Sequence, residues 1–169
     1  MLGQDGNIGG KTGTTDDAGY CFTSAYNRDG DEIYTVVLNS TTTDQRFTDT
    51  ATLANWYYGH KVTVAIANTQ EKTANGNPLM ARIGQTDWTD KTIDATLADP
   101  TTQATVFSLA GKVTEKISYD DLSGTVHVGN KVGSVTLKQD GTKIAVMDLV
   151  ADEEGAGPNP IEWLLVKLD

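Results

Sequence analysis

Apolar and polar positions alternate through most of the chain, and this pattern predicts short β-strands. Segments 18–27 (AGYCFTSAYN) and 32–39 (EIYTVVLN) alternate in this way, with an Asp-Gly pair at 29–30 between them. Asp-Gly favours the tight turn that joins hairpin strands. A calcium loop at NRDGDE is the weaker interpretation, because its glycine comes one place early and Leu38 occupies the position of the closing glutamate.

Residues 44–59 (DQRFTDTATLANWYYG) follow the period of an amphipathic helix. Asp44 is a candidate N-cap, and Gly59 is a candidate C-terminal stop. We expect one face of this helix to pack on the hairpin. That face would carry Phe47, Thr50, Ala51, Ala54 and Tyr58.

Beyond Gly59 the chain changes to short strand-like segments separated by Gly, Asp or Asn. These segments are 61–67, 78–84, 92–99, 104–110, 112–119, 124–129, 131–139 and 142–152. Strands at such even spacing predict a small antiparallel β-sandwich. We therefore expect an α+β, mainly β protein, divided into a hairpin-and-helix unit (1–60), a linker region (61–78), a β-sandwich domain (79–155) and a tail (156–169).

Charge and composition exclude several classes of partner. The chain has 169 residues, a formal net charge of −10 and a pI near 4.5. Nucleic-acid binding requires a basic face, and docking to anionic lipid requires basic clusters, so neither partner is expected. With one cysteine, Cys21, no internal disulfide can form, and we expect a small buried thiol. The two histidines lack other soft donors, so we predict no metal site and no cofactor.

Neither end of the chain has the pattern of a membrane-spanning segment. The start, MLGQDGNIGG, lacks the basic and apolar regions of a signal peptide, and no run of 18 apolar residues occurs. The tail NPIEWLLVKLD is apolar but too short to span a bilayer. It could begin a membrane anchor, or it could cover the β-domain, and the sequence does not decide between these.

The chemistry-bearing stretch is residues 9–22, GGKTGTTDDAGYCF. Lys11, Thr12, Gly13 and Thr14 place a cation, hydroxyl groups and a flexible backbone at one strand edge. The ammonium supplies charge, the hydroxyls supply hydrogen-bond donors, and glycine permits a close approach. This set of groups can hold a carboxylate.

Lys-Thr-Gly is also the third signature of the penicillin-recognising serine acyltransferases. The order KTGTTDDAGYCF, then EIYTVVLNS, then a helix containing Arg46, Leu53 and Trp56 resembles the D-alanyl-D-alanine carboxypeptidases. These low-molecular-mass penicillin-binding proteins trim peptidoglycan stem peptides. In that family the β-lactamase-like peptidase domain ends in such a helix, and an accessory β-domain and an amphipathic membrane anchor follow. The resemblance covers essentially the whole chain.

The resemblance assigns roles to the residues of this stretch. Lys11 would be the cation near the nucleophile and near the carboxylate of the substrate or β-lactam. Thr12 and Thr14 would offer hydroxyls to that carboxylate beside Gly13, and the backbone N–H of Thr14 would be the second oxyanion-hole donor. Arg46 would bind the terminal carboxylate of the substrate, which suits its fork-shaped guanidinium. Without the resemblance, Arg46 would be interpreted as a solvated charge on the first helical turn.

The other two family signatures are missing. No Ser in the chain is followed three places later by Lys, and no Ser-x-Asn occurs. An acyl-enzyme mechanism requires a nucleophile paired with a base. We therefore expect a fragment that is inactive alone, cut from an exported parent of the cell envelope whose membrane-associating segment lies beyond this chain. Because the fragment exposes a sheet edge, we also expect dimerisation or strand exchange.

One alternative remains open at this point. The chain could be a non-catalytic, cell-wall-associated binding or scaffolding module in which KTGTT is a Thr-rich turn. A class A β-lactamase also has Lys-Thr-Gly, but its chain ends soon after the equivalent helix.

In the second half we expect the acids at 120–121 and 152–154 to be solvated turn residues. Trp88 and Trp163 could stack on sugars, although core positions are commoner for such residues. For the β-domain the family suggests a pedestal or an interaction surface.

Overall fold

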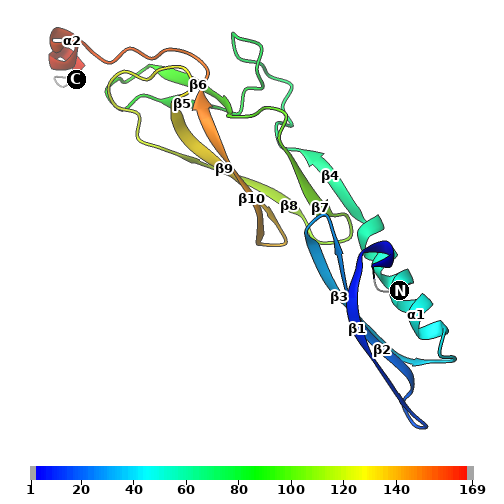
Figure 1. The fold of residues 1–169 in the computed structure, drawn as a ribbon. Coiled ribbons are helices and arrows are strands. Elements are labelled where there is room, and N and C mark those ends of the chain that lie inside the picture. The colour runs from blue at the N-terminus through cyan, green and yellow to red at the C-terminus, as the bar shows by residue number, and fades with distance from the viewer. Residues whose placement is uncertain (1–2, 167–169) are drawn as a thin grey trace. The chain divides into compact units, whose positions relative to one another are not determined.

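The computed structural model describes residues 3–166 and is mainly β, with 49% strand and 14% helix. This confirms the predicted β-rich α+β class. The chain forms two compact units, one ending at Lys61 and the other beginning at Val62. Figure 1 shows the elements of each unit.

The first unit contains a three-stranded antiparallel sheet in the order β1-β2-β3. Its elements are a 3-10 turn η1 (Gln4–Gly6) and strands β1 (Asn7–Thr15), β2 (Gly19–Arg28) and β3 (Asp31–Ser40). The hairpin predicted from the Asp-Gly pair is confirmed, since Arg28 pairs with Asp31 across the turn. Asp29 and Gly30 both have positive φ angles, 52° and 85°, as the tight hairpin turn requires.

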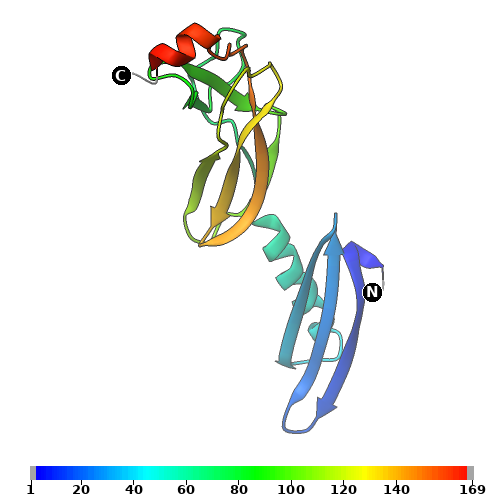
Figure 2. The ribbon, with the colours of Figure 1, turned by 90° about the vertical axis from the view of Figure 1, so that its left-hand side faces the viewer.

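Helix α1 (Gln45–Gly59) covers one face of this sheet (Figure 2). The helix begins after Asp44 as predicted, but the side chain of Asp44 makes no capping bond. Instead the hydroxyl of Thr42 accepts a hydrogen bond from the N–H of Gln45 at 3.0 Å. The ring of Phe47 meets that of Phe22 on β2 edge-on, with centroids 5.0 Å apart. This contact fixes which face of β2 lies under the helix.

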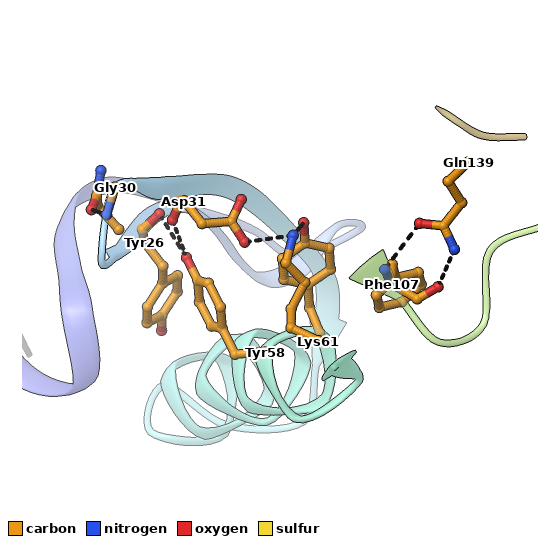
Figure 3. A network of polar contacts seen from close by, with 9 residues as sticks. Tyr26, Gly30, Asp31, Tyr58, Lys61, Phe107 and Gln139 are labelled. Atoms are coloured by element: carbon orange, nitrogen blue, oxygen red, sulfur yellow. Dashed lines mark hydrogen bonds and ion pairs between the residues drawn. The ribbon is translucent and has the colours of Figure 1, made fainter. Parts of the chain in front are cut away.

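The end of α1 is tied to the hairpin turn by polar contacts (Figure 3). The hydroxyl of Tyr58 lies 2.8 Å from the carbonyl oxygen of Asp31 and 3.2 Å from that of Tyr26. Lys61 forms an ion pair with the carboxylate of Asp31 at 3.0 Å. Burial, and then the charge of Asp31, raise the pKa of Tyr58 above its ordinary value.

The opposite face of the sheet exposes a row of apolar side chains on β3, which we call the β3 apolar row. Its members Tyr34, Val36 and Leu38 are 72%, 57% and 71% exposed.

Cys21 lies on β2 and is half-buried, so the expectation of a buried thiol was wrong. Its Sγ lies 3.2 Å from the carbonyl oxygen of Ala18.

The second unit contains a five-stranded antiparallel sheet in the order β5-β6-β10-β9-β8 and a two-stranded sheet of β4 and β7. The strands are β4 (Lys61–Ala65), β5 (Ala81–Gly84), β6 (Thr92–Leu97), β7 (Gln103–Phe107), β8 (Val113–Tyr119), β9 (Lys131–Gln139) and β10 (Thr142–Ala151). The last element is α2 (Pro160–Val166).

One hydrophobic core lies between the two sheets of this unit. Its fully buried members include Ile93 on β6, Val132 on β9 and Leu149 on β10, together with Ile66 and Ala104 from the β4 and β7 region. Burial of this apolar surface, which contributes about 25 cal/mol per Å², stabilises the layered arrangement. The described helices include none that is both long and apolar enough to cross a bilayer.

One detail of the second unit differs from the sequence prediction. The segment expected to form a strand at 124–129 makes only an isolated bridge between Val126 and Gly155. The strand predicted at 61–67 is confirmed as β4, which pairs with β7. Trp88 is half-buried and outside the core, and the ammonium of Lys91 lies 3.2 Å from its ring centroid. The side chain of Trp163 and residues 167–169 of the tail lie outside the described part of the chain.

Asp152, which follows β10, is buried. The expectation that it is a solvated turn residue was therefore wrong. Its carboxylate accepts hydrogen bonds from the hydroxyl of Thr73 and, at 2.7 Å, from the side-chain amide of Asn77. The side-chain amide of Asn75 donates to its backbone carbonyl. One carboxylate therefore anchors the loop 73–77 to the five-stranded sheet.

We expect Asp152→Ala to destabilise the second unit by about 2–4 kcal/mol, because the buried hydroxyl of Thr73 and the half-buried amide of Asn77 would lose their acceptor. Hydrogen exchange of the β9 and β10 amides would measure this change without assuming that both units unfold together. Asp148→Ala is the matched control, since it removes only the exposed ion pair with Lys131, worth about 0–1 kcal/mol. Equal effects of the two substitutions would contradict the anchoring role.

Candidate functional site

Four of the predicted site residues, Lys11, Thr12, Gly13 and Thr14, lie on β1, which is an edge strand of the first unit's sheet. Lys11, Gly13 and Thr14 are exposed, and Thr12 is half-buried. An edge strand has one row of backbone N–H and C=O groups without a partner in the sheet. The candidate residues are therefore carried on a strand whose outer side is open.

The register of β1 and β2 assigns these residues to faces. Thr12 pairs with Phe22, and Thr14 pairs with Tyr20. Because side chains of paired residues share a face, Thr12 and Thr14 lie on the helix-covered side. Lys11 and Gly13 project to the other side. The ammonium of Lys11 donates to the carbonyl oxygen of Thr12 at 2.8 Å, which brings the charge back beside the strand's backbone.

The direction of the backbone groups follows from the tight contact at Gly10. A Cβ added at Gly10 would lie 2.5 Å from the carbonyl oxygen of Thr23, so this carbonyl faces β1. Thr23 is the register partner of Lys11. In an antiparallel pair the hydrogen-bonded positions alternate, so the backbone N–H groups of Thr12 and Thr14 face the open edge.

Arg46 joins the first turn of α1 to this strand. Its Nη1 donates to the hydroxyl of Thr14 at 3.1 Å, across 32 residues of sequence. The side chain is not the solvated charge considered from sequence, because Arg46 is only 9% exposed. The guanidinium carbon lies 4.9 Å from the Phe47 ring centroid and 5.8 Å from that of Tyr20.

The guanidinium of Arg46 has binding capacity left. Its Nε is buried without a hydrogen-bond partner, and within residues 3–166 no carboxylate pairs with it. A partly desolvated guanidinium binds an anion more strongly than a fully hydrated one. Arg46 therefore lies beside Thr14 with a charge that no carboxylate of the described residues neutralises.

Space for a ligand exists beside Lys11 and Gly13, on the sheet face opposite the helix. A Cβ built on Gly13 would meet nothing within 4 Å. On the sheet face opposite the helix, a hollow of about 260 Å³ opens beside Lys11. It is lined by Gly9, Gly10, Lys11, Thr23, Ser24, Ala25 and Tyr34. The strand is thus accessible around the Lys-Thr-Gly triplet.

The described residues 3–166 hold no serine bonded to a lysine or histidine base. The hydroxyl of Ser24 is buried and bonded to that of Thr35, and the hydroxyl of Ser40 donates to Asp49. Within the same residues no group of three or more His, Cys, Asp and Glu side chains gathers as a metal site would require. The groups that the described residues bring together here are therefore donors and cations, which suit an anion.

Tyr20 is a site neighbour that the sequence analysis did not select. Its ring lies against Arg46 and its position pairs with Thr14. Only the register of the β1–β2 hairpin reveals this, because a tyrosine in an alternating strand carries no signal of its own. The turn at 16–18 sets this register, and its sequence DDA is not specific for one turn type, so it could not have revealed the pairing.

The chain is similar in structure to D-alanyl-D-alanine carboxypeptidases and penicillin-binding proteins. One is the D-alanyl-D-alanine carboxypeptidase DacD of Francisella tularensis, at 22% identity and TM-score 0.44, over 92% of this chain and 37% of that one. Another is penicillin binding protein 5 of Haemophilus influenzae, at 19% identity and TM-score 0.46, over 86% and 41%. A third is a peptidoglycan synthesis regulatory factor of Streptococcus pneumoniae, at 22% identity and TM-score 0.48, over 89% and 43%.

No family model and no curated protein matches the sequence. The chain spans about two fifths of the length of the three solved structures. Similarity at this level of identity describes a fold in outline and does not assign a substrate or a reaction. The assignment of function depends on the residues of β1 and α1.

Proposed function

We propose that this chain is part of a serine-type D-alanyl-D-alanine carboxypeptidase that acts in peptidoglycan maturation. In this proposal β1 and α1 supply the wall of the active site that binds the carboxylate of the stem peptide or of a β-lactam. The nucleophilic serine and its lysine base come from a longer parent protein. The observation that carries the proposal is the contact of Arg46 with Thr14 on an exposed Lys-Thr-Gly edge strand.

The chemistry of the carboxylate site follows from its donors. Thr12 and Thr14 provide hydroxyls, and Arg46 provides a guanidinium charge beside Thr14 that no carboxylate of the described residues pairs with. Two or three charge-assisted hydrogen bonds orient a carboxylate better than a single point charge does. Lys11, whose ammonium lies against the open backbone of Thr12, adds a positive field near the reacting bond.

The same strand offers one oxyanion donor. The N–H of Thr14 faces the open edge of β1, where a carbonyl oxygen of the substrate can approach over Gly13. A preorganised donor of this kind typically contributes about 3 kcal/mol to transition-state stabilisation. The second donor would be the backbone N–H of the serine that the parent supplies.

The chain alone is expected to be inactive, because it holds neither a Ser-x-x-Lys nor a Ser-x-Asn motif. Incubation with a fluorescent penicillin should therefore leave the purified 169-residue chain unlabelled. The parent should become labelled in stoichiometric amount, on a serine that precedes residue 1 of this chain. Mass spectrometry after proteolysis would locate the adduct. A stable adduct on a serine of this chain, or an unreactive parent, would refute the proposal.

The β3 apolar row supports the proposal that another part of a longer protein packs against this sheet. Tyr34, Val36 and Leu38 form an exposed apolar row on the sheet face opposite α1. In the parent, we propose, the preceding part of the peptidase domain covers it. In the isolated chain a second copy would cover it by dimerisation or strand exchange. Sedimentation velocity at increasing concentration, compared between the chain and its Val36→Glu variant, would detect this, and a monomer throughout would contradict it.

The remaining features of the proposal follow from the reaction. A peptidoglycan substrate places the parent outside the cytoplasm, in the cell envelope, with stem peptides and β-lactams as its ligands. Membrane association would depend on a segment beyond this chain. The second unit would serve as a pedestal for the peptidase domain or as an interaction surface.

A further inference from the structure

The second unit contains a hollow of about 420 Å³ that is separate from the carboxylate site. It lies between the segment leading from β4 toward β5, the start of β5, and β8. Its lining residues are Ile66, Asn68, Thr69, Glu71, Leu79, Met80, Ala81, Arg82 and Glu115. A volume of this size falls within the range of roughly 300–1,000 Å³ that small-molecule sites occupy.

The floor of the hollow is apolar and well anchored. Ile66 and Leu79 are buried at 3% and 7% exposure, and Met80 is half-buried. The N–H of Leu79 donates to the carbonyl oxygen of Glu71 at 3.0 Å, which joins the two walls of the hollow. The N–H of Met80 donates to Ala95 on β6 at 2.9 Å. The hollow is therefore a fixed feature of the sheet edge and not a gap between loose loops.

The charges around the hollow are unequally paired. Arg82 is neutralised by two acids, with its Nη1 3.5 Å from Glu71 and its Nε 3.3 Å from Asp94. Glu115, on β8, is exposed, and its side chain has no hydrogen-bond or ion-pair partner among residues 3–166. Partial burial against the hollow raises its pKa above the ordinary value. The hollow thus has a net negative charge, and one carboxylate in it lacks a counter-ion.

From this geometry we propose that the hollow binds a primary ammonium group carried on a short aliphatic chain, as in the side chain of a lysine residue of a peptide. The ammonium pairs with Glu115, and the methylene stem lies on Ile66, Leu79 and Met80. Amphipathic side chains of this kind bury their stem on apolar surface and keep the charged head beside an acid. An acidic ligand is disfavoured, because Arg82 is already paired with Glu71 and Asp94, whose charges would repel it.

The test is a titration of the 169-residue chain with Nα-acetyl-L-lysine methylamide, followed by ¹⁵N–¹H NMR. The expected result is a saturable shift of amide signals at residues 66–69, 79–82 and 115. The uncharged analogue Nα-acetyl-L-norleucine methylamide, which keeps the stem and lacks the ammonium, should bind at least about tenfold more weakly. Glu115→Gln should weaken lysine binding by a similar factor, since the two side chains have nearly the same shape.

Asp90→Asn is the matched control, because Asp90 is an exposed acid outside the hollow and its loss changes the net charge equally. It should leave the dissociation constant unchanged. Binding requires the ionised form of Glu115, so affinity should fall on acidification as the pH passes the raised pKa of this group. The pH titration uses the unaltered chain, so it stays informative even where a variant folds poorly.

Three results would overturn the inference. They are equal binding of the norleucine analogue, an unchanged affinity in Glu115→Gln, and shifts that do not saturate or that map away from the hollow. None of these outcomes depends on the carboxypeptidase proposal. Failure of this test therefore leaves the assignment of β1 unaffected, and the reverse is equally true.

Discussion

Lys11→Ala in the full-length parent is expected to slow acylation by penicillin by roughly a hundredfold to a thousandfold. The ammonium of Lys11 lies 2.8 Å from the carbonyl oxygen of Thr12, at the open edge where substrate would bind. Its loss removes the positive field from both the carboxylate and the developing oxyanion. Stopped-flow measurement of the second-order acylation rate would give the effect directly.

Lys116→Ala provides the control for Lys11→Ala. Lys116 is exposed on β8 in the second unit, so its removal changes the net charge equally without touching β1. Its acylation rate should equal that of the unaltered parent. If Lys11→Ala also reacted at the unaltered rate, the Lys-Thr-Gly strand would not line the active site.

Arg46→Ala should lower kcat/KM for a stem peptide with a free terminal carboxylate by about tenfold to a hundredfold. The expected loss corresponds to one charge-assisted interaction of about 1.5–3 kcal/mol. For a peptide that ends in an amide, kcat/KM should be low in the parent and should fall little further in the variant. The ratio of the two kcat/KM values, carboxylate to amide, is therefore the informative quantity.

A structural role of Arg46 must be separated from substrate binding, because its guanidinium also packs against Phe47 and Tyr20. Arg46→Lys keeps the charge but loses the planar fork, so we expect an intermediate ratio. A purely structural role would lower the rates for both peptides equally in both variants. That outcome, checked against unchanged hydrogen exchange in α1, would remove Arg46 from the proposed carboxylate site.

The local elements of the fold could be predicted from sequence because their causes are local. The Asp-Gly pair at 29–30 specifies a turn with two positive φ angles, and the hairpin follows from it. The start of α1 after Asp44 was predicted for a similar reason. The residue that caps the helix was not predicted, because Thr42 and Asp44 are both suitable cap residues. Which of them bonds to the first turn depends on the backbone conformation before the helix.

Contacts between distant segments could not be predicted in this way. The bond from Arg46 to Thr14 joins residues 32 positions apart and depends on the register of β1 and on the angle of α1. Asp152 was interpreted as a solvated acid because its neighbours are acidic, whereas its burial depends on where the loop 73–77 folds back. The interpretation of Glu115 likewise needed the hollow in which it lies.

The most direct test is a crystal structure of the parent acylated by benzylpenicillin. The account predicts an ester on a serine that precedes this chain, and a penicillin carboxylate within hydrogen-bond distance of the Thr12 or Thr14 hydroxyl, close to Arg46. The ester carbonyl oxygen should meet the N–H of Thr14. A penicillin carboxylate held by residues away from β1, or a β1 edge covered by another part of the protein, would contradict it.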